Sequence, residues 1–303
     1  MKNLLFEYSS IVGEDLPLWK PYGANLRGVL ENHIKEAWKQ HDYQQIYTPH
    51  IGKIGVYKQA NICPNQVLAM YESSYEHLLD LCQHKLSLNP EEAESEQLNK
   101  FILKLFEMMN LSLKKYSDAT DDKERAKALL DWLVKQEIFY LRLSSSVNHI
   151  YVYNADRKTH HHLPYRLAEI SSVYSKDENN KIFALTQDEI NVFCEPYQIE
   201  NELFRIVQLA KTIFEKLKLK LELKVQANLA HIIEPLGVDY TIDDSCEIKF
   251  TSNNFDLGTV FVNNKLPHDF QLEYIGKDNQ EHCPAMICGT CIGSFENFCE
   301  NFL

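Results

Sequence analysis

The sequence predicts an α+β protein, and three features of the 303-residue chain support this prediction. Residues 163–194 contain two apolar runs separated by a polar, charged turn, which is typical of a β-hairpin. Residues 219–225 alternate between an apolar and a charged residue, as expected of a half-buried strand. Elsewhere, long stretches carry apolar residues at 3.6-residue spacing, which predicts amphipathic helices.

The first of these helices is predicted at residues 24–40, where charged residues occupy the face opposite an apolar stripe. The stripe consists of Leu26, Val29, Leu30, Ile34, Ala37 and Trp38. The segment 16–23 before the helix contains two prolines and predicts a loop. The segment 45–49 after the helix predicts a strand that ends at Pro49.

Residues 64–135 change in composition to helix-forming residues, and we expect three helices there. One start is marked by Asn89 followed by Pro90, the pattern of an N-cap with proline at the first helical position. The apolar side chains expected to pack these helices are Leu98, Phe101, Ile102, Leu105, Met108 and Met109. We interpret the segment as a helical subdomain that serves as a structural cap or a docking surface.

The remaining elements follow from the same patterns. Strands are predicted at residues 137–143, 247–251, 256–263 and 270–275, and helices at residues 199–217 and 293–302. Residues 149–153 fit either a second strand or the start of a helix.

Two groups of residues contain potential metal ligands, but neither predicts a metal site. Consecutive residues point in different directions, so His160, His161 and His162 predict a solvated turn. Cys288 and Cys291 supply two ligands at most, fewer than the three or four that zinc needs.

Composition restricts the class of partner. The formal net charge of −12 disfavours an extended RNA-binding surface, because nucleic-acid-binding proteins usually present a basic one. No apolar run is long enough to span a bilayer, so no membrane partner is expected. Eight cysteines without regular spacing indicate reduced thiols. These features together predict a cytoplasmic protein.

Three segments resemble the three signature motifs of class II aminoacyl-tRNA synthetases, and within that class they are most similar to threonyl-tRNA synthetases. PLWKPYGANLRGVLENHIKEAWKQHDYQQIYTPHIGK resembles the first motif, LPYRLAEI with TQDEINVFC the second, and DFQLEYIGKDNQEHCPAMICGTCIGSFENF the third. The resemblance covers most of residues 14–60 and 137–303. It implies an antiparallel sheet flanked by helices.

The same resemblance defines the expected domains. Residues 1–63 would be the first part of a catalytic-like domain and residues 136–303 the rest. The family has a much shorter link between these parts, so residues 64–135 would be an inserted helical subdomain. No anticodon-binding or editing domain is expected in this sequence.

Adenylate formation needs fixed positive charge around ATP, and the family supplies it with arginines. By resemblance, three of these arginines align with Ser175, Phe183 and Asn297. Lys176 and Lys181 lie close by and are candidate catalytic substitutes, although lysine lacks the bidentate fork of arginine.

The family also selects threonine with a zinc ion held by one cysteine and two histidines. By resemblance these ligands become Ser146, Asn191 and Cys288. Serine and amide oxygens are poor zinc ligands, so we expect no zinc. A family lysine aligns with Glu247, which reverses the charge.

Other positions keep the character of a binding site. The candidate ligand-binding residues are Gln187, Glu189, Asn191, Thr259 and Arg166, where Glu189 stands in place of an aspartate that binds the substrate amine in the family. Arg166 and Glu169 fit a structural ion pair as well as they fit site residues.

The sequence therefore predicts a degenerate, threonyl-tRNA-synthetase-like protein that acts as a non-aminoacylating scaffold, regulator or small-molecule sensor. A homodimer is expected through the first motif, at Ile46, Tyr47 and Pro49. A further protein or a small amino-acid-like ligand would be the partner, and tRNA is not expected. The alternative is a repurposed ligase that activates an amino acid for an acceptor other than tRNA, and only this alternative requires ATP and magnesium.

Overall fold

The computed structural model describes residues 2–60, 68–69, 124, 139–176, 182–245 and 247–302. The chain divides into two compact units, one formed by Met1–Leu68 with Tyr140–Leu303 and the other by Ala69–Phe139. The helices predicted within residues 64–135 lie outside the described residues, apart from Leu68, Ala69 and Glu124, and Lys181 also lies outside them.

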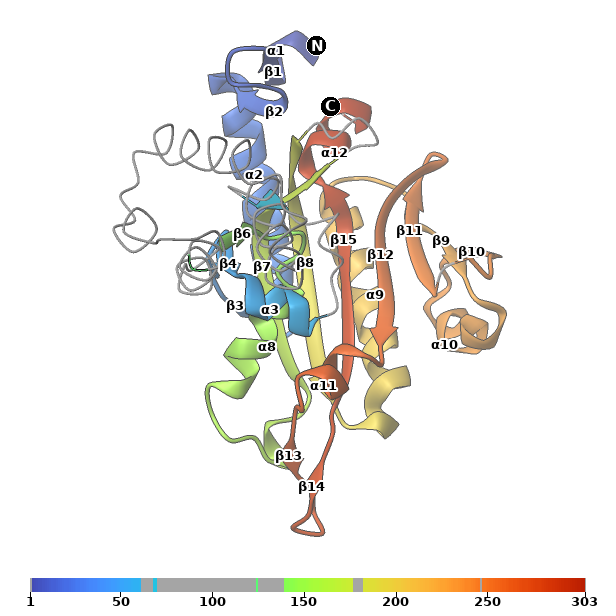
Figure 1. Cartoon of the computed structure of the whole chain (residues 1–303). Helices are drawn as coiled ribbons and strands as arrows, with labels where there is room; N and C mark the ends of the chain where they lie inside the picture. The colour runs from blue at the N-terminus through green and yellow to red at the C-terminus, as the bar shows by residue number, and fades with distance from the viewer. Residues whose placement is uncertain are drawn as a thin grey trace, which may run out of the picture. The chain divides into compact units, whose positions relative to one another are not determined.

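The first unit is built on a ten-stranded, mostly antiparallel sheet (Figure 1). Its main path runs β1-β2-β8-β15-β12-β11-β9-β10, while β7 pairs with β8 and with β3. The strands are β1 (Phe6–Ser9), β2 (Gly13–Trp19), β3 (Gln44–Gln45), β7 (Tyr165–Lys176), β8 (Ile182–Cys194), β9 (Glu222–Val225), β10 (Asp239–Ile242), β11 (Ile248–Ser252), β12 (Phe255–Asn263) and β15 (Ala285–Ser294). Three pairs are parallel: β2 with β8, β3 with β7, and β10 with β9.

Helices and short strands complete the described part of the chain. The helices are α1 (Lys2–Leu5), α2 (Pro21–Gln40), α3 (Ile54–Gln59), α8 (Ser146–Asn154), α9 (Ile199–Lys216), α10 (Ala230–Ile233), α11 (Leu266–Asp269) and α12 (Phe295–Phe302). The short strands are β4 (Ile51–Lys53), β5 (Leu68–Ala69), β6 (Phe139–Leu141), β13 (Tyr274–Ile275) and β14 (Glu281–His282). The predicted antiparallel sheet flanked by helices is confirmed.

One face of the sheet is covered by α2 and α9, which form the main hydrophobic core with it. Side chains alternate between the two faces of a strand, so Ala168, Ile190 and Val192 all point toward these helices. Both helices contribute apolar residues at helical spacing, such as Ile34 on α2 and Ile206 on α9, which are completely buried. This packing fixes which residues of β7 and β8 face the opposite side.

The opposite face carries a smaller core beneath α8. Val147 and Ile150 of α8 pack there with Leu167 of β7 and Phe193 of β8. On these two strands the small core takes odd-numbered residues, whereas the main core takes even-numbered ones, because alternate side chains point to opposite faces. Between this small core and the far ends of β7 and β8 lies a group of buried polar side chains, which we describe below.

The prediction of a loop at residues 16–23 is wrong. Strand β2 includes Pro17, and α2 begins at Pro21. Pro17 is tolerated because it has no register partner on either neighbouring strand: β1 pairs with β2 at Gly13, Leu18 and Trp19, and β8 pairs with it at Asp15.

The predicted strand at residues 45–49 is also wrong beyond Gln45. The Thr48 N–H donates to a carboxylate oxygen of Glu169 at 2.9 Å instead of joining a strand ladder. A side chain distant in sequence therefore ends the strand.

Other boundaries differ from the predictions in length or type. Residues 149–153 belong to helix α8, and the strand predicted at 219–225 begins only at Glu222. Of the strand predicted at 137–143, the described part starts at Phe139 and contains β6, which ends at Leu141. Residues 270–275 contain only β13, because Gln271 has a φ of 50°, which interrupts an extended backbone. His160–His162 form a 3₁₀ turn. The remaining predicted elements agree within a few residues.

Candidate functional site

Strand alternation brings most of the predicted site residues to one face of the sheet. Gln187, Glu189 and Asn191 of β8 lie at every second position, so their side chains point the same way. Ser171 and Glu169 of β7 lie directly opposite Gln187 and Glu189. The site face is therefore the one opposite the main core.

The neighbouring strands extend this face. Cys288 of β15 lies directly opposite Asn191, and Phe261 of β12 lies opposite Cys288. Thr259 is two residues before Phe261 and half-buried, so the sequence-predicted residue shares the same face. Ser175 lies opposite Phe183 farther along the hairpin.

Three other predicted positions lie elsewhere. Asn297 is exposed on α12. Glu247 is half-buried just before β11, and its Oε2 accepts a hydrogen bond from the Val262 N–H at 2.7 Å. Lys176 ends β7.

Of the two alternatives for Arg166 and Glu169, a mutual ion pair is contradicted by the structure. They are three residues apart on one strand, which places them on opposite faces of the sheet. Arg166 instead forms a bidentate pair with Glu202 of α9, with distances of 2.6 and 2.7 Å. Arg166 therefore lies across the sheet from the other candidate ligand-binding residues.

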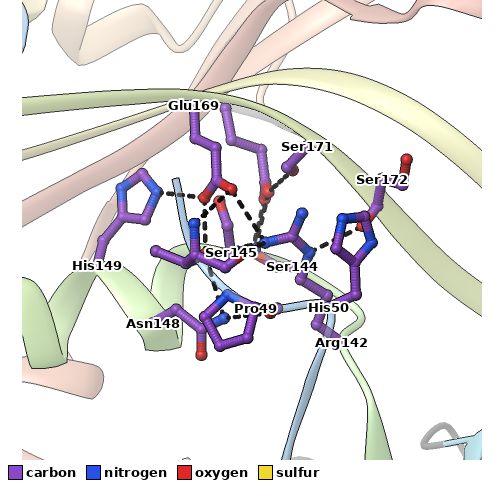
Figure 2. Close-up of polar contacts among 12 residues, drawn as sticks. Pro49, His50, Arg142, Ser144, Ser145, Asn148, His149, Glu169, Ser171 and Ser172 are labelled. Carbon is purple, nitrogen blue, oxygen red and sulfur yellow. Dashed lines mark hydrogen bonds and ion pairs between the residues drawn. The ribbon is translucent and has the colours of Figure 1, made fainter. Parts of the chain in front are cut away.

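Glu169 is the centre of a buried polar cluster, and Figure 2 shows Arg142 and His149 approaching it from opposite sides. The Arg142 guanidinium lies 3.2 Å from Oε1 and the His149 Nε2 lies 3.3 Å from Oε2. Thr48 donates to the carboxylate from its N–H and its hydroxyl, at 2.9 and 2.7 Å. Burial opposes the charge, but these hydrogen bonds and the Arg142 charge outweigh it and hold the pKa of Glu169 below its usual range.

Arg142 is fully engaged within the protein. It is 1% exposed, and besides Glu169 it donates to the carbonyl oxygen of Ser172 at 2.8 Å and to the Thr48 hydroxyl at 2.8 Å. Its position joins β7 to the segment around Thr48. Because it is buried and hydrogen-bonded to both segments, this arginine stabilises the fold of the site.

His149 links this cluster to the middle of the site. Asn191 Nδ2 donates to His149 Nδ1 at 3.0 Å, and His149 Nε2 then faces Glu169. This arrangement needs a hydrogen on Nε2 and none on Nδ1. Asn191 Oδ1 in turn accepts from the Ser146 hydroxyl at 3.0 Å. A continuous chain of hydrogen bonds therefore runs from Ser146 to Glu169.

Ser146, Asn191 and Cys288, the three positions aligned with zinc ligands, meet at one end of this chain. Ser146 and Asn191 are hydrogen-bonded to each other, and the Ser146 hydroxyl also interacts with the Cys288 thiol. Cys288 is 2% exposed, and burial raises the pKa of its thiol to about 12. Within the part of the chain that the structure describes, no three His, Cys, Asp or Glu side chains are grouped to hold a metal ion.

Glu189 forms a second buried cluster beside the first. Its Oε1 accepts from the Ser144 hydroxyl at 2.7 Å, and its Oε2 accepts from the Ser145 N–H and the Ser171 hydroxyl, both at 2.7 Å. Glu189 is only 5% exposed. The carboxylate predicted to bind a ligand therefore points to the N-terminus of α8, where protein donors surround it.

Sequence reasoning missed Arg142, His149 and the pair Ser144–Ser145 as parts of this site. Arg142 was visible as a lone charged residue within an apolar run, which indicates a buried, paired arginine. The serines gave no such signal, because their role depends on Glu189, more than 40 residues later in the sequence.

Known proteins match both the sequence and the fold. The family model of the tRNA synthetase class II core domain (G, H, P, S and T) matches residues 132–299. The threonine–tRNA ligases of Rhodopirellula baltica and Azobacteroides pseudotrichonymphae are 25% and 26% identical, and each match covers 97% of this chain. The chain spans only 45% and 43% of the lengths of these two relatives.

Two solved structures share the fold at low sequence identity. The RNA binding domain of threonyl-tRNA synthetase from Cryptosporidium parvum Iowa II has a TM-score of 0.67 and 15% identity, covering 98% of this chain and 68% of that one. Giardia lamblia prolyl-tRNA synthetase in complex with prolyl-adenylate has a TM-score of 0.60 and 10% identity, covering 95% and 48%. Since the family model matches more than half of the 303 residues, the chain belongs to the tRNA synthetase class II core domain (G, H, P, S and T) family.

Proposed function

We propose that this chain is a degenerate, threonyl-tRNA-synthetase-like protein that forms no aminoacyl-adenylate and acts in the cytoplasm as a dimeric scaffold, regulator or small-molecule sensor. The observation that carries this proposal is the state of the amino-acid site. The side chains at the zinc-ligand and amine-binding positions hydrogen-bond to one another, to neighbouring side chains or to nearby backbone.

The donor set at the zinc-equivalent positions does not fit zinc. Ser146 offers a neutral hydroxyl and Asn191 an amide, and both are weak ligands compared with thiolate and imidazole. Their mutual hydrogen bond would have to break before either could bind a metal. Cys288 alone cannot hold the ion, so we derive no zinc-dependent step for this site.

The amine-binding position supports the same proposal. A free carboxylate would attract the ammonium group of an amino acid, but both oxygens of Glu189 already accept hydrogen bonds from protein donors, three in all. An ammonium group that displaced one of these donors would break a hydrogen bond to a carboxylate, worth about 1.5–3 kcal/mol.

The charge around the ATP position supports it further. Ser175 and Phe183 lie opposite each other on the site face and carry no charge at neutral pH. Arg142, the arginine in the buried polar cluster, donates to Glu169, Thr48 and Ser172. A nucleoside triphosphate would therefore lack the guanidinium groups that usually bind its phosphates.

The proposal is tested by titrating the full chain with ATP and magnesium in a calorimeter. We expect no saturable heat at ATP concentrations up to the millimolar range, because Ser175, Phe183 and Asn297 stand at the positions that the resemblance aligns with ATP-binding arginines. A magnesium-dependent dissociation constant in the micromolar range would instead favour the repurposed ligase, with Lys176 and Lys181 as the first residues to substitute.

A homodimer through the first motif is the second part of the proposal, and exposed apolar side chains in this region support it. Tyr47 is 77% exposed, Tyr22 is 55% and Val29 is 53%. We expect sedimentation velocity at micromolar concentration to give a dimer. Tyr47→Arg should weaken dimerisation at least about tenfold, since it would place a charge in an apolar contact.

The matched control for this test is Tyr197→Arg, because Tyr197 is a similarly exposed tyrosine, at 71%, outside the first motif. It should leave the sedimentation coefficient unchanged. A monomeric wild-type protein, or equal effects of the two substitutions, would refute an interface at the first motif.

A further inference from the structure

Glu189 is bound like a ligand within its own protein. Both of its carboxylate oxygens accept short hydrogen bonds, from Ser144 Oγ, Ser145 N and Ser171 Oγ, all at 2.7 Å. The donors come from two separate parts of the chain, the start of α8 and the middle of β7. They converge on one small, buried position.

These donors have the chemistry of an anion receptor. The N-terminus of a helix presents free N–H groups and a partial positive charge, and α8 is nine residues long. Two serine hydroxyls add donors that can rotate to suit the anion. Ser145 and Ser171 are 0% and 1% exposed, so the receptor is shielded from water and has little room beyond a carboxylate.

A separate observation indicates that the receptor has an unused donor. The Ser145 hydroxyl is buried and has no hydrogen-bond partner within the described residues, although the N–H of the same residue binds Glu189. Buried hydroxyls normally find a partner. A carboxylate that is not tethered to β8 could shift toward this hydroxyl and use it as a fourth donor.

We propose that the N-terminus of α8, with Ser144, Ser145 and Ser171, is a carboxylate-binding site, that Glu189 is its built-in occupant, and that small monocarboxylates are the ligand class it accepts when Glu189 is absent or withdrawn. This inference deepens the proposed function and rests on it, because an internal carboxylate that fills the amino-acid site keeps that site closed. Glutamate, with one more methylene than aspartate, supplies the reach from β8.

The test is chemical rescue of Glu189→Ala with sodium acetate, followed by thermal unfolding of the full chain. We expect this variant to unfold at a lower temperature than wild type. Acetate should raise its midpoint in a saturable way, by about 3–6 °C at a concentration 100-fold above the dissociation constant. Wild type should not respond, because Glu189 already fills the site.

Two controls define the chemistry of the rescue. Acetamide has the shape of acetate without its charge and should give no comparable shift in Glu189→Ala. The double variant Glu189→Ala/Ser171→Ala should respond more weakly to acetate, since it lacks one donor. Equal shifts with acetate and acetamide, or an equal acetate response in wild type, would overturn the inference.

A second measurement applies if Glu189→Ala does not fold. Ser171→Ala should shift the unfolding equilibrium of wild type at least about tenfold, since hydrogen bonds to charged groups are the stronger ones. In the Glu189→Gln background the same substitution should have a smaller effect, because a hydrogen bond to a neutral amide oxygen is weaker than one to a carboxylate. Equal effects in both backgrounds would refute the role of Glu189 as occupant.

Failure of this inference is distinguishable from failure of the proposed function. The rescue is read from the stability of Glu189 variants, whereas the proposed function is read from nucleotide binding and pyrophosphate exchange by wild type. Activation of an amino acid by wild type would refute the proposed function. The acetate rescue of Glu189→Ala would still decide whether the site binds a carboxylate.

Discussion

Wild-type protein is expected to contain no stoichiometric zinc, whereas the double variant Ser146→Cys/Asn191→His should bind about one zinc ion per chain. The two positions are already in contact at 3.0 Å, and Cys288 interacts with Ser146. The variant would therefore bring two sulfur ligands and one imidazole together, a set that zinc favours. Metal binding would also lower the pKa of the Cys288 thiol, since zinc-bound cysteines are deprotonated.

Zinc content is measured by elemental analysis after dialysis against metal-free buffer. The control is Ser146→Ala/Asn191→Ala, which breaks the same hydrogen bond without adding a ligand and should bind no zinc. One zinc per chain in wild type would contradict the expectation and would point to ligands outside the described residues. A zinc-free Cys–His variant would show that the three positions do not converge closely enough.

Substitution of Arg142 by methionine is expected to destabilise the protein by about 3–5 kcal/mol. Arg142 and Glu169 are 1% and 2% exposed, so the change removes one partner of a buried ion pair and leaves the other charge without it. Thr48 and His149 still donate to Glu169, but they cannot replace the lost charge. Urea unfolding at neutral pH would give the change in free energy.

The control is Arg157→Met, because Arg157 forms an ion pair with Glu281 in which both side chains are largely exposed, at 78% and 60%. Exposed pairs contribute about 0–1 kcal/mol, so this change should have little effect. A loss of less than about 1 kcal/mol in Arg142→Met would show that the pair is not a main stabilising feature of the site.

Local patterns were sufficient to predict much of the fold. The hairpin of β7 and β8 was predicted from two apolar runs separated by a polar, charged turn, and the helix α9 from 3.6-residue periodicity. These features depend on neighbouring residues only.

The rest could not be predicted because it depends on contacts between distant segments. Strand β3 ends early since Glu169, 121 residues later than Thr48, takes the Thr48 N–H. Arg166 pairs with Glu202, which no local pattern indicated. Resemblance located the zinc-equivalent positions, but only the structure brings Ser146, Asn191 and His149 into one hydrogen-bonded chain.

The central claim, that this member of the family forms no aminoacyl-adenylate, is tested most directly by exchange of labelled pyrophosphate into ATP with each of the common amino acids. We expect every rate to be at least about a hundredfold below that of a threonyl-tRNA synthetase under the same conditions. Removal of a single transition-state donor typically costs a hundred- to a thousandfold in rate, and by resemblance Ser175, Phe183 and Asn297 stand at the positions of three such donors. Exchange with one amino acid that falls on Lys176→Ala or Lys181→Ala would contradict the claim and establish the repurposed ligase in its place.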